Sequence, residues 1–225
     1  MKITKLGHCC LVIEEEKRRG SADPFPSKCL RILTDPGSYS TGQSKVKNID
    51  IILITHEHQD HLHIESLKSV LVNNPKAKVF TNRGVGKILD KEKVRYELLG
   101  HGQSKIIDGV WIEGFGDKHA DLYTTVPVAI NTGYLIAKRF FYPGDAFYNP
   151  KKGVEILALP VAGPWMKISE AVDYAKEIKP KICFPVHDGM LLPDRIGAAH
   201  RIPQNVLEAM GTKFVVLKEG EEREF

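Results

Sequence analysis

The feature that most constrains this chain is a short apolar run that ends abruptly in a cluster of histidines and a carboxylate. Residues 50–55 (DIILIT) are typical of a strand that is buried on both faces. The next residues, 56–61 (HEHQDH), hold three imidazoles and two carboxylates, Glu57 and Asp60, of which Asp60 is the candidate ligand. Imidazole nitrogen and carboxylate oxygen are ligands for a borderline metal such as zinc. The sequence therefore predicts a metal site at the end of this strand.

Within this cluster, His56 and His58 are placed to share one ion, and Asp60 and His61 point at a second position nearby. The alternative to a metal site is an ordinary polar loop exposed to solvent. The chain has 9 histidines in 225 residues, so three within six residues are not expected by chance. This density favours the metal site.

Length and composition favour a globular protein. The 225 residues show no repeat and no linker, so we expect a single domain over 1–225. The net charge of +4 is scattered and forms no basic stripe, so nucleic acid is not an expected partner. No apolar run approaches the ~18 residues of a membrane helix. The first five residues lack a signal region and the 4 cysteines lack C-x-x-C spacing, so a cytoplasmic location is expected.

The order of the expected elements predicts the fold class. Strands dominate, and each half of the chain begins with strands and ends in a strand–helix unit. The simplest packing is an α+β fold, a four-layer αββα sandwich of two mixed β-sheets with outer helices. Strands are expected at 9–16, 29–34, 50–55, 78–81, 94–98, 104–108, 110–115, 131–137, 139–142, 155–159, 181–186 and 213–217, with a polar turn at 18–21. Helices are expected from 64 to Pro75, from Ser169 (as N-cap) to Lys179, and at 204–210, while the middle of the chain alternates strands and turns.

The H-x-H-x-D-H pattern after an apolar strand resembles the metallo-β-lactamase superfamily, whose fold is the same αββα sandwich. The stretch from Leu159 to His187 is similar to the small ascorbate-6-phosphate lactonase-like branch and its metal-dependent hydrolase relatives. The resemblance extends over nearly the whole chain. Its other motifs occur in the superfamily's order: Leu6-Gly7-His8, Asp35-Pro36-Gly37, His119, Gly144-Asp145 and Pro185-Val186-His187.

The resemblance implies two metal sites with shared ligands. Asp117 is the alternative to His119, because two other charged residues, Asp117 and Lys118, stand beside His119 and allow the alignment with the family to slip. Asp35 is expected to orient the metal loop without binding an ion. The implied ligands are His56, His58 and His119 for the first ion, Asp60, His61 and His187 for the second, and Asp145 as a bridge between them.

Two further residues are candidates for the substrate pocket. His8 either lines the pocket or merely ends a strand. Trp165 either forms an apolar wall or covers the core. Trp165 also replaces a Thr that often precedes Met in the lactonase-like pattern, which argues against transfer of the sugar-phosphate substrate.

The expected activity is that of a dinuclear metal-dependent hydrolase with Asp60 at the catalytic position. Two ions ~4 Å apart share one water and lower its pKa, so that metal-bound hydroxide attacks a small lactone, ester or phosphodiester. Zinc is the expected metal and manganese the alternative, because His58 stands where iron-binding relatives carry a carboxylate.

Two other functions stay open from the sequence. One is a non-catalytic metal-binding module. The other, less favoured, is a nuclease, because the gaps between motifs leave no room for the large inserted cap of the RNA-processing branches. A small-molecule substrate is expected, and a homo-oligomer is compatible with the sequence.

Overall fold

The computed structural model describes residues 1–16 and 29–225, and within them the chain forms two seven-stranded sheets. Both sheets are mixed, with parallel pairing from β3 to β6 in the first and from β10 to β13 in the second. The first sheet runs, in spatial order, β14 (Glu222–Glu224), β1 (Lys2–Gly7), β2 (Cys10–Glu15), β3 (Leu30–Thr34), β4 (Ile51–Ile54), β5 (Lys78–Thr81) and β6 (Glu97–Leu98). The second runs β13 (Lys213–Phe214), β12 (Ile182–Val186), β11 (Ile156–Pro160), β10 (Phe140–Tyr142), β9 (Gly133–Ile136), β8 (Val110–Phe115) and β7 (Ser104–Ile107).

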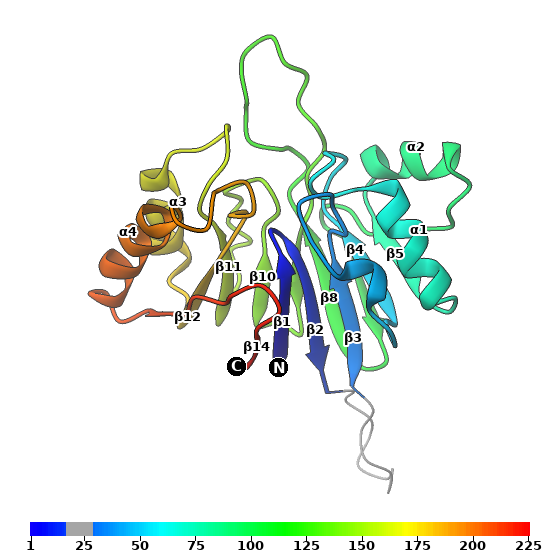
Figure 1. Cartoon of the computed structure of the whole chain (residues 1–225), viewed down its shortest axis with the longest axis horizontal. Coiled ribbons are helices and arrows are strands. Elements are labelled where there is room, and N and C mark those ends of the chain that lie inside the picture. Colours follow the sequence, from blue (N-terminus) through cyan, green and yellow to red (C-terminus); the bar gives the residue numbers. More distant parts are fainter. Residues whose placement is uncertain (17–28) are drawn as a thin grey trace, which may run out of the picture.

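Two helices flank each sheet on its outer side (Figure 1). α1 (Ile64–Asn73) and α2 (Arg83–Lys91) pack on the first sheet, and α3 (Ile168–Ile178) and α4 (Gly197–Glu208) pack on the second. A short 3-10 turn, η1 (Gln43–Lys45), lies beside α1. Among the described residues, no helix has the length and apolar character needed to cross a membrane.

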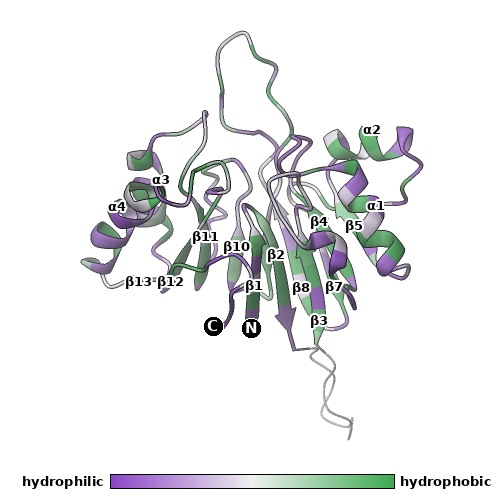
Figure 2. Cartoon of the chain, viewed as in Figure 1, coloured by the Kyte–Doolittle hydropathy of each residue, from purple (hydrophilic) through white to green (hydrophobic). Residues whose placement is uncertain are grey.

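Three apolar clusters separate the four layers. The central cluster joins the inner faces of the two sheets, and each outer cluster joins one sheet to its two helices. β4 shows how the sequence makes this possible: Ile51 and Leu53 belong to the central cluster, and Ile52 belongs to the cluster under α1. Successive side chains of a strand point to opposite faces, so a continuous apolar run serves both layers. Figure 2 shows the apolar residues concentrated in the sheets and the polar residues on the outward helix surfaces.

The α+β, four-layer αββα architecture expected from the sequence is therefore confirmed. The expected hairpin of β9 and β10 is also present, with Leu135 opposite Phe141. The expected turn at 18–21 lies outside the described residues.

Several expected boundaries are wrong. The middle of the chain holds α2 in addition to strands and turns. α4 begins at Gly197, not at residue 204, because the helix continues through Pro203. The N-cap of α3 is Lys167 and not Ser169, and its backbone N–H donates to the Glu170 carboxylate (2.7 Å). The last expected strand covers only β13, since Val215 to Leu217 leave the sheet.

The topology brings several strand ends to one edge of the sandwich. β3 and β4 are parallel neighbours in the first sheet, and β10 to β12 are parallel in the second. The residues that follow these strands lie in the loops at the top of the view in Figure 1. β1 runs antiparallel to β2, and β2 runs antiparallel to β3, so β1 and β3 end at the same edge. The turn from β1 to β2 therefore lies there too. Asp35, His56, Asp145 and His187 thus come from distant parts of the chain to one place.

Candidate metal centre

All seven ligands named from the sequence lie together at this edge. They fall into two groups in which the potential ligand atoms lie within 4.8 Å of one another. The first group comes from the loop after β4 and the loops after β8 and β10, and the second adds the turn after β1 and the end of β12. The first group is His56, His58, His119 and Asp145. The second is Asp60, His61 and His187 together with His8, which is not among the seven.

Asp145 contacts imidazoles of both groups. Its Oδ2 lies 3.4 Å from His119 Nε2 in the first group and 2.9 Å from His187 Nε2 in the second. Its Oδ1 lies 3.2 Å from His61 Nε2. This carboxylate is 2% exposed, so no bulk water separates it from the imidazoles. Asp145 therefore has the position of a ligand shared by two ions.

The backbone holds Asp145 in this place. Gly144 has a φ of +64°, and a Cβ on it would lie 2.3 Å from Asn131 Oδ1, so only glycine fits this turn. Asn131 Oδ1 accepts a hydrogen bond from the Asp145 backbone N–H (2.9 Å). The short turn after β10 and the side chain of Asn131 thus fix the carboxylate between the two groups.

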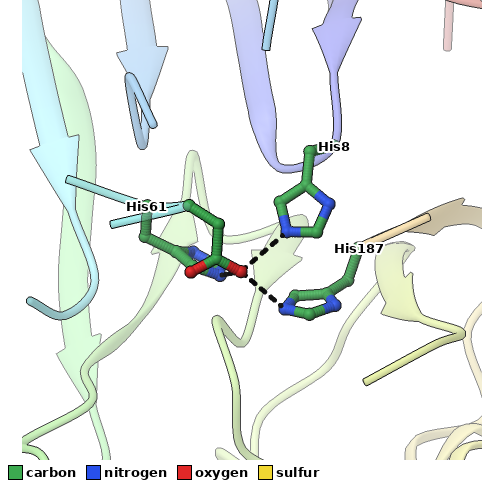
Figure 3. A group of neighbouring side chains, drawn as sticks. His8, His61 and His187 are labelled. Carbon is green, nitrogen blue, oxygen red and sulfur yellow. Dashed lines mark hydrogen bonds and ion pairs between the residues drawn. The ribbon is translucent and has the colours of Figure 1, made fainter. Parts of the chain in front are cut away.

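The second group surrounds the Asp60 carboxylate. His61 Nε2 and His187 Nε2 lie 3.7 Å and 3.5 Å from Asp60 Oδ2. Figure 3 shows the rings of His8, His61 and His187 converging on one carboxylate, with dashed lines for these contacts. The loop that carries Asp60 lies close against Gly37, where a Cβ would stand 1.7 Å from the Asp60 carbonyl oxygen. Glycine in the Asp35-Pro36-Gly37 motif is therefore required by this close approach.

Hydrogen bonds decide which nitrogen of each imidazole faces the centre. His61 donates from Nδ1 to Asp35 Oδ2 (2.7 Å), and His119 donates from Nδ1 to the Ala120 carbonyl. His56 Nδ1 lies 3.0 Å from Thr55 Oγ1, which in turn donates to Asp35 Oδ2 (2.7 Å). In a neutral imidazole, an Nδ1 that donates leaves Nε2 with a bare lone pair. In their neutral forms, these three rings therefore present lone pairs to the centre.

A divalent cation fits the buried polar atoms that remain without a hydrogen-bond partner. Buried polar atoms in proteins are almost always hydrogen-bonded. Here several buried atoms lack a hydrogen-bond partner and point toward one another, an arrangement that a cation would stabilise. They are His61 Nε2, His119 Nε2, His187 Nε2 and Asp145 Oδ1.

The electrostatics of the site also suit a cation. Burial holds the pKa of His56 well below its usual range, which keeps this imidazole neutral, the form that binds metal. Burial by itself would raise the pKa of Asp145, but the facing His61 and His187 outweigh it and hold this pKa well below its usual range. The centre thus combines a neutral His56 with an ionised Asp145. Burial alone would lower the pKa of His61, but Asp145 and Asp35 outweigh it and raise this pKa well above its usual range, so an ion that binds here takes the place of a proton on His61.

Comparison with known proteins places the chain in a family. Residues 2–187 match the family described as Beta-lactamase superfamily domain. The chain belongs to this superfamily. Protein Rv0786c of Mycobacterium tuberculosis is 32% identical to it over 224 residues, which cover 97% of each protein. A relative from Thermoplasma volcanium, named a metal-dependent hydrolase, is 27% identical over 232 residues, 97% of this chain and 96% of its own.

Solved structures show the same superfamily fold. Igni18, described as a metallo hydrolase from Ignicoccus hospitalis, has a TM-score of 0.72 and 22% identity, and the match covers 100% of this chain and 98% of that one. An isothiocyanate hydrolase from Delia radicum gut bacteria has a TM-score of 0.68 and 15% identity, with 100% and 99% coverage. These likenesses support the fold.

The remaining predicted residues of this superfamily member take distinct places. His119 is 2% exposed and faces the centre, whereas Asp117 is exposed and lines a separate pocket beside His101. Asp35 is buried and touches His61, but lies outside both ligand groups. The Trp165 ring makes edge-to-face contacts with His119 and His187, with distances of 5.8 Å and 5.7 Å between the ring centroids. Since it also packs on Phe147, Trp165 both borders the centre and covers the core.

Sequence reasoning missed some residues that shape the centre. Cys9 forms a third group of potential ligands with His61 and Asp145, and its only signal is that it follows His8. Tyr142 donates a hydrogen bond to Asp35 from the end of β10. Asn131 gives no signal in the sequence, because its role depends on the turn that it packs against.

Proposed function

We propose that this chain is a metal-dependent hydrolase that holds two divalent ions, zinc first and manganese as the alternative, and acts on a small lactone, ester or phosphodiester. The observation that carries the proposal is the position of Asp145 between two groups of ligands. A shared carboxylate is what brings two ions close enough to act on one bond. The name of the Thermoplasma volcanium relative, a metal-dependent hydrolase, supports the reaction class.

Bound ions would supply an activated water and a Lewis acid for the oxygen of the bond that is cleaved. His56, His58 and His119 would hold the first ion, and Asp60, His61 and His187 the second, with Asp145 shared. Asp35 keeps Nε2 of His61 directed at the centre by accepting the hydrogen of Nδ1. The buried Trp165 lies beside His119 and His187, where it excludes water from one side and offers a flat apolar surface to the substrate.

The experiment compares wild type with Asp60→Ala after loading with zinc or manganese. The probes are p-nitrophenyl acetate, bis(p-nitrophenyl) phosphate and a γ-lactone. We expect wild type to hydrolyse at least one of them and Asp60→Ala to keep its circular dichroism spectrum but lose turnover. Gln59→Ala is the matched control, because Gln59 lies in the same loop with its side chain exposed.

Turnover retained in Asp60→Ala would contradict this mechanism. Metal binding by wild type without turnover on any probe would instead support a non-catalytic metal-binding module.

A further inference from the structure

His8 lies in the turn between β1 and β2 and faces the second group of ligands. It is 1% exposed, its Nε2 lies 3.2 Å from Asp60 Oδ2, and its ring centroid is 4.2 Å from that of His187 (Figure 3). By position alone it could be a further ligand of the ion held by Asp60, His61 and His187. The hydrogen bonds of its ring distinguish a ligand from a hydrogen-bond donor.

The decisive contact is on the far side of the ring. The backbone N–H of Gly189 donates to Nδ1 of His8 (3.1 Å). Nδ1 must therefore carry a lone pair, which excludes the doubly protonated ring. A neutral imidazole has one N–H, so in His8 the hydrogen is on Nε2. His61 and His119 have the opposite arrangement, with a hydrogen on Nδ1, so that Nε2 is the nitrogen through which they can bind an ion.

We propose that His8 is a positioning residue that donates a hydrogen bond from Nε2 to Asp60 and does not bind the ion. This inference rests on the proposed two-ion site. A nitrogen that carries a hydrogen has no lone pair for a cation, so His8 stays outside the ligand set despite its position. Its N–H instead fixes the orientation of the Asp60 carboxylate, as the outer partners of metal ligands do.

His8 also connects Asp60 to the ligand on the other sheet. Its carbonyl oxygen accepts a hydrogen bond from the His187 backbone N–H (3.2 Å). The two turns approach so closely that a Cβ on Gly189 would lie 2.9 Å from the His8 Cβ. His8 itself has a φ of +45°, in the left-handed region that non-glycine residues rarely adopt. His8 therefore contacts Asp60 through its ring and His187 through its backbone.

The direct test is the protonation of the ring nitrogens, read by nitrogen-15 NMR on the metal-free and the zinc-loaded full chain. We expect His8 to carry its hydrogen on Nε2 in both forms. His61 is the internal control, since it is expected to keep a hydrogen on Nδ1 in both forms, while its Nε2 signal is expected to move when zinc binds. A His8 Nε2 that has no hydrogen and moves with zinc would overturn the proposal.

Two variants test the consequence for metal binding. His8→Gln keeps an N–H donor, and His8→Phe keeps a ring of similar size without one. We expect both to bind two zinc ions at saturation, with affinity for one ion lowered about 10- to 100-fold in His8→Phe and largely restored in His8→Gln. His187→Gln is the ligand control and should lose one ion.

Loss of one ion from both His8 variants would identify His8 as a ligand and overturn the proposal. Fewer than two ions in the loaded wild type would contradict the proposed function instead. The metal-free spectrum still decides the position of the His8 hydrogen in that case.

Discussion

At the residue scale, Asp35 connects one imidazole of each ligand group. It accepts a hydrogen bond from His61 directly and reaches His56 through the hydroxyl of Thr55. It also accepts the Thr55 backbone N–H (2.8 Å) and the Tyr142 hydroxyl. A single buried carboxylate thus contacts residues beside both proposed ions, and its role in orienting the metal loop stays a prediction.

Replacing Asp35 with asparagine should weaken metal binding and the fold together. The asparagine amide would place an N–H₂ group where donors from Thr55, His61 and Tyr142 now face a carboxylate oxygen, so one donor would face another. We expect zinc affinity to fall about 10- to 100-fold and unfolding free energy to fall by about 1–3 kcal/mol, measured by calorimetric titration and urea denaturation. Asp117→Asn, at an exposed site, is the control. An Asp35→Asn protein with wild-type zinc affinity would show that the ligands need no such partner.

A second buried carboxylate, Asp188, gives a prediction for pH. Both of its oxygens lie 2.7 Å from Lys5 Nζ, and His200 Nε2 lies 2.9 Å from Oδ2. Burial alone would raise the pKa of Asp188, but His200 and Lys5 outweigh it and lower this pKa from its ordinary value of 3.8. Because the folded pKa is lower than the unfolded one, the ionised group contributes stability above about pH 5. That contribution is lost as pH falls through the folded pKa.

We therefore expect Asp188→Asn to be less stable than wild type at pH 7 by about 3–5 kcal/mol, since the substitution leaves Lys5 buried without its partner. The difference should shrink as the pH is lowered below 4. Urea denaturation of the metal-free proteins at several pH values measures it. Asp173→Asn, in an exposed ion pair with Lys176, is the matched control. A difference that stays constant down to pH 2 would refute the assignment.

How far the sequence predicts the centre differs from residue to residue. His56, His58, Asp60 and His61 are close in sequence after one strand, so their pattern suffices to bring them together. The choice between Asp117 and His119 depends on which side chain is buried, and a local sequence pattern does not give that information. Asn131 contacts Asp145 across 14 residues, and only the folded turn creates that contact.

At the scale of elements, most strands were predictable because apolar runs and turns mark them, whereas β1, β14 and α2 were not expected. The sequence of α2, RGVGKILDK, contains two glycines, which lower helix propensity. The structure compensates with Asn82, whose Oδ1 accepts from the backbone N–H groups of Gly84 (2.9 Å) and Val85 (3.2 Å). Its Nδ2 also donates to the Thr55 carbonyl (2.7 Å), just before the metal loop. α4 is longer than the expected helix at 204–210, because Pro203 lies inside the helix, where proline is rarely found.

Asn82→Ala should therefore destabilise the protein more than the loss of an ordinary helix cap. The cap contributes about 0.5–2 kcal/mol. The lost hydrogen bond to the Thr55 carbonyl, which keeps its bond from the Thr132 backbone N–H (3.0 Å), adds about 0.5–1.5 kcal/mol. Asn82→Asp keeps the cap and loses the bond to Thr55, so its loss of stability should lie between those of wild type and Asn82→Ala. Thermal denaturation ranks the three proteins. Equal stability of Asn82→Ala and Asn82→Asp would show that the cap contributes nothing.

At the scale of the whole molecule, the two sheets meet at the metal centre. Asp60 and His61 follow β4 of the first sheet, and Asp145 and His187 follow strands of the second. The αββα architecture was predictable because both halves of the sequence have the same strand-then-helix order. The distances between the halves were not, because they depend on the packing of the central cluster.

The most direct test of the two-ion centre is the metal content of the untagged, zinc-loaded protein, measured by plasma mass spectrometry with Asp60→Ala alongside. We predict two ions per chain in wild type and one in Asp60→Ala, since that variant removes a ligand of the second ion only. One ion or none in wild type would contradict the sharing of Asp145 between two ions.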